Sequence, residues 1–403
     1  MKTKRYDVVV VGGGIGGIAS ALAAARRGCK TALIEKLFVP GGLATSGLVY
    51  IYLPICDGYG TQVSKSLAEE LLHKSFLYGP GSVDDGWQTR SAHDHDSLRY
   101  RCIFSPAACM LGWESMLEDA GVDVWYDSLV CGVRMERRRV KAVELENMSG
   151  RVAVAGKVFV DATGACVVAR LAGAPTLSAN NSRTIWVLDH QHQGEDQPGF
   201  KDLAANLKVN YISSLPPEEL PPDYDKPNYR DPSGKDVSEY AISTRRELRQ
   251  KYLDAYASGK YDRTTYFPVK LPIMPQFRRI LCIDGQTTLQ PGQFGERFED
   301  SVGLVADWRR PGEVWEIPYG SLLPQKVEGV IAAGRCTAAA GDAWEVTRVI
   351  PAAAVTGEAA GVAAALCVKR RTIPSMLPVK TLQNALAANG VPLHLPDVGL
   401  TYK

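Results

Sequence analysis

The first 35 residues contain two apolar runs separated by an alanine-rich stretch. Residues 6–11 form a continuous, valine-rich run, which predicts a strand buried on both faces. Residues 15–27 are rich in alanine and end before a glycine, which predicts a helix, and residues 30–34 predict a second strand. Two strands joined by a helix within so short a stretch predict a βαβ unit with a right-handed crossover.

The stretch that follows, up to residue 172, combines one helix with several strands. The helix is expected over residues 106–120, because a proline stands in its first turn and a glycine follows its end. Apolar and polar residues then alternate in short segments, as in the strands of a meander. These expected strands cover residues 122–126, 130–135, 140–146 and 152–160.

Residues 173–266 differ in texture, with prolines clustered between residues 216 and 232 and one helix expected over residues 243–258. After Gly320 the earlier pattern returns, with a strand over residues 327–333, a glycine turn and an alanine-rich helix that starts at Pro351. This order predicts an α/β fold: a Rossmann-like dinucleotide-binding domain with a parallel sheet and a β-meander, plus an inserted α+β substrate domain. The expected boundaries are residues 1–172 and 320–371 for the dinucleotide-binding domain, residues 173–319 for the substrate or cap domain, and residues 372–403 for a C-terminal helical extension.

The composition and net charge of the chain indicate which classes of binding partner to expect. With 403 residues, 45% of them hydrophobic and 22% charged, the chain can bury a large core, and disorder is not expected. The 46 Lys and Arg residues nearly balance the 44 Asp and Glu residues, and no long run carries one sign. Such a chain lacks the basic stripes that phosphate backbones require, so nucleic acid is not expected as a partner.

The spacing of the cysteines indicates which redox and metal sites to expect. The length of the apolar runs indicates where in the cell the protein is expected. The nine cysteines include no CxxC pair, which argues against a disulfide scaffold, a zinc site, an iron–sulfur cluster and a redox dithiol. The apolar run after the basic N-terminus is too short for a secretory signal, and no segment approaches the roughly 20 apolar residues of a membrane helix. We therefore expect a cytoplasmic protein with no membrane partner, of an oligomeric state that the sequence does not define.

Gly12, Gly14 and Gly17 form the pattern G-x-G-x-x-G between the first strand and the first helix, and Glu35 ends the next strand, 18 residues after Gly17. In a dinucleotide site Gly12 permits the tight turn, Gly14 lets the backbone approach a pyrophosphate at the helix N-terminus, and Gly17 allows close packing of the helix on the strand. Glu35 can accept hydrogen bonds from ribose hydroxyls and disfavours a 2′-phosphate. The pattern in this context predicts a dinucleotide site, although it does not separate NAD from FAD.

Four further glycine- or proline-containing segments follow in a recognisable order. They are Gly41-Gly42-Leu-Ala-Thr45, Asp161-Ala-Thr-Gly164, Ala333-Gly-Arg-Cys336 and Arg348-Val-Ile-Pro351. Together with Ile-Pro-Tyr-Gly-Ser-Leu-Leu at residues 317–323, they resemble the FAD-dependent oxidoreductase family with a glutathione-reductase-type FAD-binding domain. The resemblance is densest over the first 60 residues and over residues 276–365, and it is weak over residues 173–266, which would choose the substrate.

The resemblance implies FAD as the cofactor and a set of contacts along it. For the pyrophosphate these are Gly12, Gly14, Ile15, Gly16 and Gly17, and for the adenosine side they are Glu35, Lys36, Val130, Thr163 and Gly164. For the ribityl chain, its phosphate and the flavin ring they are Gly42, Leu43, Ala44, Thr45, Gly334 and Arg335, and for the pyrimidine end of the flavin they are Arg348, Val349 and Ile350. Relatives often bind the ribityl chain with a Gly-Asp pair, and here both Gly334-Arg335 and Gly341-Asp342 are candidates for that place.

The implied chemistry is hydride transfer between the flavin and a small organic molecule. A flavin gains negative charge at its pyrimidine end on reduction, so donors aimed there favour the reduced state. Arg348 and the N-terminus of the last long helix would supply such donors, whereas an ion pair at the helix entry is the alternative role of Arg348. The chain has no second G-x-G-x-x-G and no dithiol, which disfavours a disulfide-reductase architecture. No catalytic residue is identified.

Candidate substrate residues are an arginine and two histidines. Arg297 is suited to binding an anionic substrate, or to an ion pair with Glu299 or Asp300. His190 and His192 alternate along the chain, as do His93 and His95, which suits either a general base or two ligands on one strand face. Since alternating histidines in polar stretches are commonly surface residues, we expect no metal.

Two alternatives to this flavoenzyme remain. One is an NAD-dependent dehydrogenase that uses the same N-terminal fingerprint without flavin. The other is a non-redox flavoprotein that acts as a binding or RNA-modification partner, which would require basic surface stripes. A yellow protein that releases FAD on denaturation would exclude the first alternative.

Overall fold

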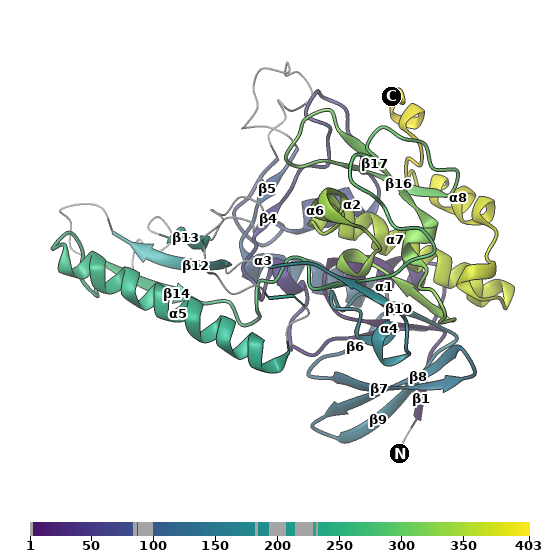
Figure 1. Cartoon of the computed structure of the whole chain (residues 1–403), viewed down its shortest axis with the longest axis horizontal. Helices are drawn as coiled ribbons and strands as arrows, with labels where there is room; N and C mark the ends of the chain where they lie inside the picture. Colours follow the sequence, from purple (N-terminus) through teal and green to yellow (C-terminus); the bar gives the residue numbers. More distant parts are fainter. Residues whose placement is uncertain are drawn as a thin grey trace. The chain divides into compact units, whose positions relative to one another are not determined.

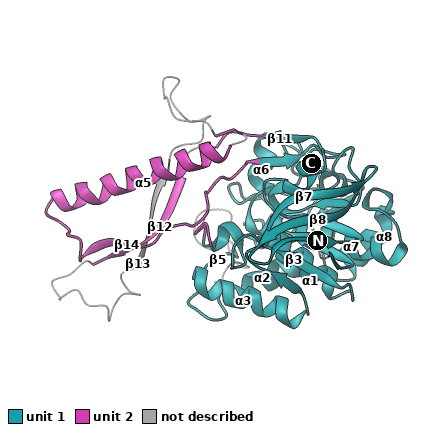
Figure 2. Cartoon of the chain, turned by 90° about the horizontal axis from the view of Figure 1, so that it is seen from below, with its two compact units in different colours: residues 1–45, 50–177, 281–403 teal, residues 46–49, 178–280 magenta. Residues whose placement is uncertain are grey.

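The computed structural model describes residues 3–83, 87, 100–181, 184–192, 207–213, 229–230 and 233–403. The chain divides into two compact units (Figure 2). Unit 1 comprises residues 1–45, 50–177 and 281–403, and unit 2 comprises residues 46–49 and 178–280.

A five-stranded parallel sheet forms the centre of unit 1 (Figure 1). Its strands, in spatial order, are β18 (Val330–Ala332), β10 (Val158–Asp161), β2 (Val8–Val11), β3 (Thr31–Ile34) and β6 (Asp123–Trp125). All residues of the first four strands are buried, as expected of a parallel sheet covered on both faces. This confirms the α/β fold with a Rossmann-like parallel sheet.

The β-meander is also confirmed, with different membership. Its sheet has the order β1 (Thr3–Arg5), β9 (Gly150–Ala155), β8 (Arg139–Asn147) and β7 (Leu129–Glu136). The strand expected over residues 122–126 is instead β6, because it pairs in parallel with β3. The strand expected over residues 152–160 is two strands, β9 and β10, separated by a turn at Gly156, where a Cβ atom would lie 2.8 Å from the Val9 side chain.

Two helices are packed against each other beside this sheet. They are α1 (Ile15–Ala25), which ends two residues earlier than expected, and α7 (Ile350–Arg370), which begins one residue earlier than expected. Gly357 allows the close approach, because a Cβ atom there would overlap the Gly16 carbonyl oxygen. The Ser20 hydroxyl donates to the Gly357 carbonyl over 2.9 Å and fixes the contact. The second turn of α7 is thereby held against the first turn of α1.

Helix α7 corrects the expectation about apolar segments. Of the described helices it is the one that is long and apolar enough to cross a membrane. However, 89% of its most apolar 18-residue window is buried inside the protein. A buried helix between a sheet and other helices meets the same compositional test, so the finding is weak evidence for a membrane span.

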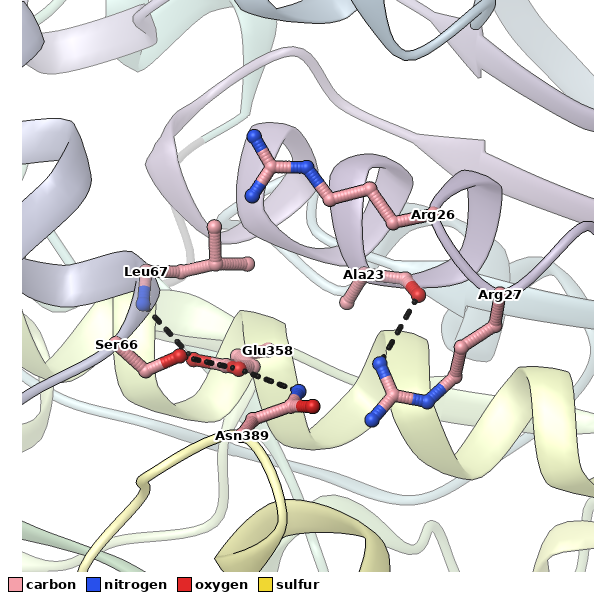
Figure 3. A pocket seen from close by; sticks show the side chains of 7 residues that line it. All are labelled: Ala23, Arg26, Arg27, Ser66, Leu67, Glu358 and Asn389. Atoms are coloured by element: carbon pink, nitrogen blue, oxygen red, sulfur yellow. Dashed lines mark hydrogen bonds between the residues drawn. The ribbon is translucent and has the colours of Figure 1, made fainter.

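A polar junction ties α7 to the start of α2 (Leu67–Lys74) and to the C-terminal part of the chain (Figure 3). The buried carboxylate of Glu358 accepts hydrogen bonds from the Ser66 hydroxyl at 2.8 Å, the Leu67 N–H at 3.1 Å and the Asn389 side-chain amide at 3.1 Å. Burial raises the pKa of Glu358 above its ordinary value. The junction lines a pocket of about 420 Å³ that Arg26 and Arg27, directly after α1, also line.

The other described helices of unit 1 have 5 to 14 residues. They are α3 (Pro106–Asp119), capped by the Ser105 hydroxyl, α4 (Val167–Leu171), α6 (Gly341–Thr347) and α8 (Val379–Ala387). The remaining strand pairs are β4 (Ile51–Tyr52) with β5 (Cys102–Ile103), β11 (Thr176–Ser178) with β15 (Leu281–Ile283), and β16 (Ser301–Ala306) with β17 (Val314–Pro318). Short 3₁₀ segments are η1 (Gly42–Ala44), η5 (Tyr319–Leu322), η6 (Gly334–Cys336), η7 (Pro374–Met376) and η8 (Leu395–Val398).

Unit 2 is an α+β unit, as expected of the inserted domain. Strand β12 (Thr184–Gln191) pairs antiparallel with β13 (Leu207–Ser213) and with β14 (Tyr266–Lys270). Helix α5 (Gly234–Ala257) starts nine residues earlier than expected, because Ser233 and Asp236 form a capping box at its N-terminus. Leu248 and Tyr252 of α5 pack with Ile185, Val187 and Tyr266 of the strands.

Two expected boundaries differ from the compact units. Residues 281–319, expected in the substrate domain, belong to unit 1, where β16 contacts α7 and pairs with β17. Residues 372–403 also belong to unit 1, where the Gln383 side-chain amide donates to the backbone carbonyl of Ser301 at 3.1 Å. The functional division of the chain stays a prediction.

Candidate dinucleotide site

The glycine turn between β2 and α1 has two positions that exclude a side chain and one that leaves open space. At Gly12, which has a φ of +100°, a Cβ atom would lie 2.5 Å from the Ala162 carbonyl oxygen, and at Gly17 it would overlap the Gly12 carbonyl oxygen. At Gly14 a Cβ atom would meet nothing within 4 Å. Gly12 and Gly17 are therefore required by the backbone itself, whereas Gly14 leaves room for an approaching group.

The open space lies at the N-terminus of α1. Gly14 is the N-cap residue of this helix, and no side chain caps it. Uncapped N–H groups and the helix dipole attract an anion such as a pyrophosphate. Ile15, Gly16 and Gly17, which are expected at the pyrophosphate, form the first turn of α1.

Glu35 lies directly after β3 and against the glycine turn. Its carboxylate accepts hydrogen bonds from the Gly13 N–H at 2.6 Å and from the Leu37 N–H at 2.8 Å. Burial raises its pKa above the ordinary value, and the backbone donors oppose that shift. Lys36 beside it is exposed.

Val130 belongs to strand β7, which begins next to Glu35. The Ser128 N–H donates to the Glu35 carbonyl at 3.0 Å, which brings the start of β7 next to Glu35. Val130 is a buried residue of this strand. The adenosine-side residues Glu35, Lys36 and Val130 therefore gather at the end of β3.

The second glycine loop packs directly on the first. The Gly41 N–H donates to the Gly13 carbonyl at 2.7 Å, and a Cβ atom at Gly42 would lie 3.2 Å from the Gly14 Cα. The Thr45 hydroxyl donates to the Pro40 carbonyl at 2.6 Å and closes the loop. Gly42, Leu43, Ala44 and Thr45 thus lie beside the turn that carries the pyrophosphate residues.

The segments at residues 161–164 and 333–336 meet at the same edge of the sheet. The Gly164 N–H donates to the Cys336 sulfur at 3.2 Å, and a Cβ atom at Gly164 would overlap the Arg335 guanidinium group. A Cβ atom at Gly16 would lie 3.0 Å from the Gly334 nitrogen. Thr163 and Gly164 are therefore next to Gly334 and Arg335, and these in turn lie next to the first turn of α1.

Two ionisable side chains of opposite charge, Arg335 and Asp161, lie at this edge. Burial lowers the pKa of Arg335 to about 10, the direction expected when a guanidinium is removed from water. Asp161 is fully buried, and its carboxylate accepts hydrogen bonds from the Thr163 hydroxyl at 2.7 Å and the Ala169 N–H at 2.9 Å. A phosphate near Arg335 would supply the negative charge that favours its protonated form.

The structure bears on the choice between Gly334-Arg335 and Gly341-Asp342. Asp342 forms ion pairs with Arg309 at 2.6 Å and with Arg310 at 3.0 Å. Its carboxylate is therefore already engaged, whereas Gly334 contacts the first turn of α1. This favours Gly334-Arg335 as the segment at the ribityl chain.

Arg348 lies at the junction of α6 and α7 in an ion pair. Its guanidinium donates to the Glu345 carboxylate, with an Nε–Oε2 distance of 2.7 Å, and it lies 5.9 Å from the centre of the Trp308 ring. No side chain caps the following helix at Val349, so the first N–H groups of α7 have no such partner. The alternative role of Arg348 as a helix-entry ion pair is therefore present, and it leaves the helix N-terminus as a separate donor.

Some buried polar side chains in these segments have no hydrogen-bond partner among the described residues. They indicate whether the segments are suited to binding a polar cofactor. In the described part of the chain they include the Ser46 hydroxyl, the Thr337 hydroxyl and the Trp344 indole N–H. Ser46 follows Thr45 directly, Thr337 follows Cys336, and Trp344 lies in α6 before Arg348. Since buried polar groups normally have partners, a polar ligand at these segments would satisfy them. Sequence reasoning missed all three, although Ser46 and Thr337 directly follow motif residues.

The comparison with protein families decides which dinucleotide the chain binds. A family model described as FAD dependent oxidoreductase matches residues 7–270 and 282–386. The chain belongs to this family. It is an FAD-dependent oxidoreductase with FAD as its cofactor, and the NAD-dependent dehydrogenase and the non-redox flavoprotein are thereby set aside. A comparison with curated proteins finds no match.

By their titles, solved structures similar to this FAD-dependent oxidoreductase include a reductase-like protein, a monooxygenase and a hydroxylase. A geranylgeranyl bacteriochlorophyll reductase-like protein from Thermoplasma acidophilum shares 16% identity at a TM-score of 0.45, over 98% of this chain and 95% of that chain. The p-nitrophenol 4-monooxygenase PnpA from Pseudomonas putida DLL-E4 shares 13% identity at 0.45, over 97% and 89%. The aromatic hydroxylase CabE from angucycline biosynthesis shares 14% identity at 0.47, over 96% and 68%. Likeness at this level does not define a reaction or a substrate.

The candidate substrate residues of the oxidoreductase belong to different units, Arg297 to unit 1 and His190 and His192 to unit 2. Arg297 pairs with Glu299 at 2.8 Å on the surface of unit 1, and it lies 5.9 Å from the centre of the Tyr402 ring. His190 is buried in β12 with its ring 4.9 Å from that of Phe267, and its Nδ1 has no partner among the described residues. The backbone N–H of His192 donates to the Thr265 carbonyl.

In the described ranges no group of three or more His, Cys, Asp or Glu side chains could hold a metal ion. His93 and His95 lie outside those ranges.

Proposed function

We propose that this oxidoreductase transfers a hydride between bound FAD and a small organic molecule. The family supplies the cofactor and the redox class. The observation that carries the assignment of residues is the convergence of the segments at residues 12–17, 41–45, 161–164 and 334–336 around the open space at Gly14. Bound FAD would supply the hydride acceptor or donor, and the protein would bind, orient and stabilise the charge.

The glycine turn and the first turn of α1 would hold the pyrophosphate. Gly12 and Gly17 shape the turn, and Gly14 leaves the room that a diphosphate needs. Arg335, half-buried beside Gly164, would add a positive charge at the phosphates or the ribityl chain. Glu35 would accept hydrogen bonds from the adenosine ribose with the part of its carboxylate that Gly13 and Leu37 do not occupy.

The N-terminus of α7 would face the pyrimidine end of the flavin. Its uncapped N–H groups would donate to the negative charge that forms there on reduction. Arg348 would add to this field, but its ion pair with Glu345 reduces its net charge at a distance. The helix end therefore contributes more to this role than the arginine does.

An anaerobic screen tests the proposed reaction. The purified, FAD-loaded enzyme is mixed without oxygen with small organic compounds, and the flavin absorbance near the visible maximum is followed. A compound that bleaches the oxidised flavin, or that restores the absorbance of chemically reduced flavin, identifies a hydride donor or acceptor. If the protein binds FAD and no substrate exchanges electrons with it unless a second protein is added, direct transfer to a small molecule is wrong.

A further inference from the structure

Three buried cysteines of unit 1 lie where the segment at residues 161–166 meets the segment at residues 334–336. Cys166, Cys282 and Cys336 are all 0% exposed. The Cys166 thiol donates to the carbonyl of Leu281, the residue before Cys282, at 3.4 Å. The Cys336 sulfur accepts a hydrogen bond from the Cys166 N–H, also at 3.4 Å. The cofactor contacts proposed above give none of the three thiols a role.

Cys166 and Cys336 contact each other in both directions. Besides accepting the Cys166 N–H, Cys336 offers its carbonyl, to which the Cys166 thiol donates at 3.8 Å. Burial raises the pKa of the Cys166 thiol well above its ordinary value, and a hydrogen bond with the Cys336 side chain adds to this shift. The two side chains therefore lie against each other, as the short span of a disulfide requires. They are 170 residues apart in the chain, so no cysteine spacing in the sequence indicates the pair.

The surroundings of the two sulfurs differ. The Cys336 sulfur accepts hydrogen bonds from the backbone N–H groups of Gly164 at 3.2 Å and Cys166 at 3.4 Å, and such donors stabilise negative charge on a sulfur. The Cys336 thiol also donates to the Asp161 carboxylate at 3.7 Å, which can take up its proton. The Cys166 thiol instead donates to two backbone carbonyls, which hold its proton in place. Of the two, Cys336 is therefore the better nucleophile.

We propose that Cys166 and Cys336 are a covalent modification site, at which hydrogen peroxide oxidises the two thiols to a disulfide. This site goes beyond hydride transfer, because it needs neither a substrate nor electrons from FAD. The bond joins two segments that are expected along the cofactor. Cys336 directly follows Arg335, and Cys166 comes two residues after Gly164. A Cβ atom at Gly164 would overlap the Arg335 guanidinium group, so the two segments already touch beside the sulfurs.

The oxidation balances in two steps. The Cys336 sulfur attacks one oxygen of the peroxide and the O–O bond breaks, which gives a sulfenic acid at Cys336 and one water. The Cys166 sulfur then attacks the sulfenic sulfur and the S–O bond breaks, which gives the disulfide and a second water. The two thiols lose two electrons to one molecule of peroxide, and both thiol protons end in water.

Peptide mapping of the FAD-loaded enzyme tests the pair. The protein is treated with hydrogen peroxide, denatured in the presence of N-ethylmaleimide and digested with trypsin without a reductant. Each cysteine of the cluster then lies in its own peptide: residues 158–170 for Cys166, 280–297 for Cys282 and 336–348 for Cys336. We expect the first and last of these peptides to be joined and to separate on addition of dithiothreitol. If both carry maleimide instead, or if either is joined to the Cys282 peptide, the proposal is wrong.

Two serine variants test the order of the steps. In Cys166→Ser the sulfenic acid at Cys336 meets no second thiol, so dimedone, which labels sulfenic acids, should mark residues 336–348 at least about tenfold more than in the wild type. Cys282→Ser is the matched control, because Cys282 is equally buried, and it should form the joined peptides as the wild type does. Visible absorbance checks that each variant retains FAD, and the wild-type map decides alone for a variant that does not fold. Equal dimedone labelling of the wild type and Cys166→Ser, or loss of the joined peptides in folded Cys282→Ser, contradicts the assigned roles.

Discussion

Both units have buried side-chain cores, but unit 1 also depends on close backbone contacts at glycines, and this difference decides what the sequence reveals about each. In unit 1 the critical positions are glycines whose missing side chains let backbones meet, as at Gly12, Gly17 and Gly357. In unit 2 the core is made of large side chains, such as Tyr240 and Phe277, whose ring centres lie 4.5 Å apart with the planes tilted by 54°. A backbone approach allows one residue type, whereas an aromatic core allows many substitutions. The expected cofactor residues of unit 1 therefore form a recognisable sequence pattern, and the core residues of unit 2 do not.

The largest effect is expected from Gly17→Val in unit 1. Even a methyl group at this position overlaps the Gly12 carbonyl oxygen, so the turn and the helix that follows cannot form together. The expected loss is about 4 kcal/mol or more, which would leave little folded, FAD-bound protein. Soluble yield and flavin absorbance per chain measure it. A yellow Gly17→Val protein of normal yield would show that this backbone contact is not required.

Phe277→Ala is the counterpart in unit 2. Phe277 is 1% exposed and packs on Tyr229 and Tyr240, so its removal should cost about 3 kcal/mol. Hydrogen exchange in α5 should rise about a hundredfold, while exchange in α1 and the FAD content should stay unchanged. Equal acceleration in both helices would mean that the two units do not unfold separately.

Glu358→Gln probes the polar junction of unit 1 in Figure 3. Its three partners all donate, so a glutamine amide nitrogen would face a donor and cost about 1–3 kcal/mol in the free energy of unfolding. Urea denaturation measures the loss. Glu70→Gln, which breaks a more exposed ion pair with Arg26, is the control and should cost about 1 kcal/mol or less.

The difference in the free energy of unfolding between the wild type and Glu358→Gln should change with pH in a defined direction. Because burial raises the pKa of Glu358 above 4.5, the folded protein binds the proton more tightly than the unfolded chain does. The contribution of Glu358 protonation to the free energy of unfolding is fully present below pH 4.5. It is lost as pH rises through the raised pKa. The stability gap between the wild type and Glu358→Gln should therefore narrow as pH increases above 4.5, and a gap that widens would contradict the assigned cause.

Arg348→Ala is expected to give the smallest effect. Losing a cation near the pyrimidine end should make the flavin harder to reduce, but the ion pair with Glu345 has already reduced that charge. We expect the midpoint potential to fall by about 30 mV or less, which corresponds to about 1.4 kcal/mol for two electrons. Spectroelectrochemical titration measures it, with Arg310→Ala as a surface control. An unchanged potential would assign Arg348 to the helix-entry ion pair alone.

The sequence could predict most of unit 1 because its strongest signals are local. Gly12, Gly14, Gly17 and Glu35 come from one βαβ unit, whose strand and helix periods are visible without tertiary knowledge. Strand β6 was misassigned because three residues do not show whether they pair in parallel with β3 or antiparallel with β7. The partnerless hydroxyls of Ser46 and Thr337 were missed because burial depends on residues distant in the chain. Arg297 was a candidate for binding a substrate, but it forms an ion pair with Glu299. The two residues are only two positions apart, so this pairing could have been predicted from the sequence.

A comparison of two glycine-to-alanine variants, one in each unit, tests most directly whether the turn before α1 holds the cofactor. Gly14 and Gly234 both stand at the start of a helix, and at both a Cβ atom meets nothing within 4 Å. FAD affinity is measured by titrating the deflavinated proteins and following flavin fluorescence. Gly14→Ala should fold normally and bind FAD at least about tenfold more weakly, because its methyl group occupies the room for the pyrophosphate, and Gly234→Ala should match the wild type. Equal FAD affinity for all three proteins would contradict the assignment.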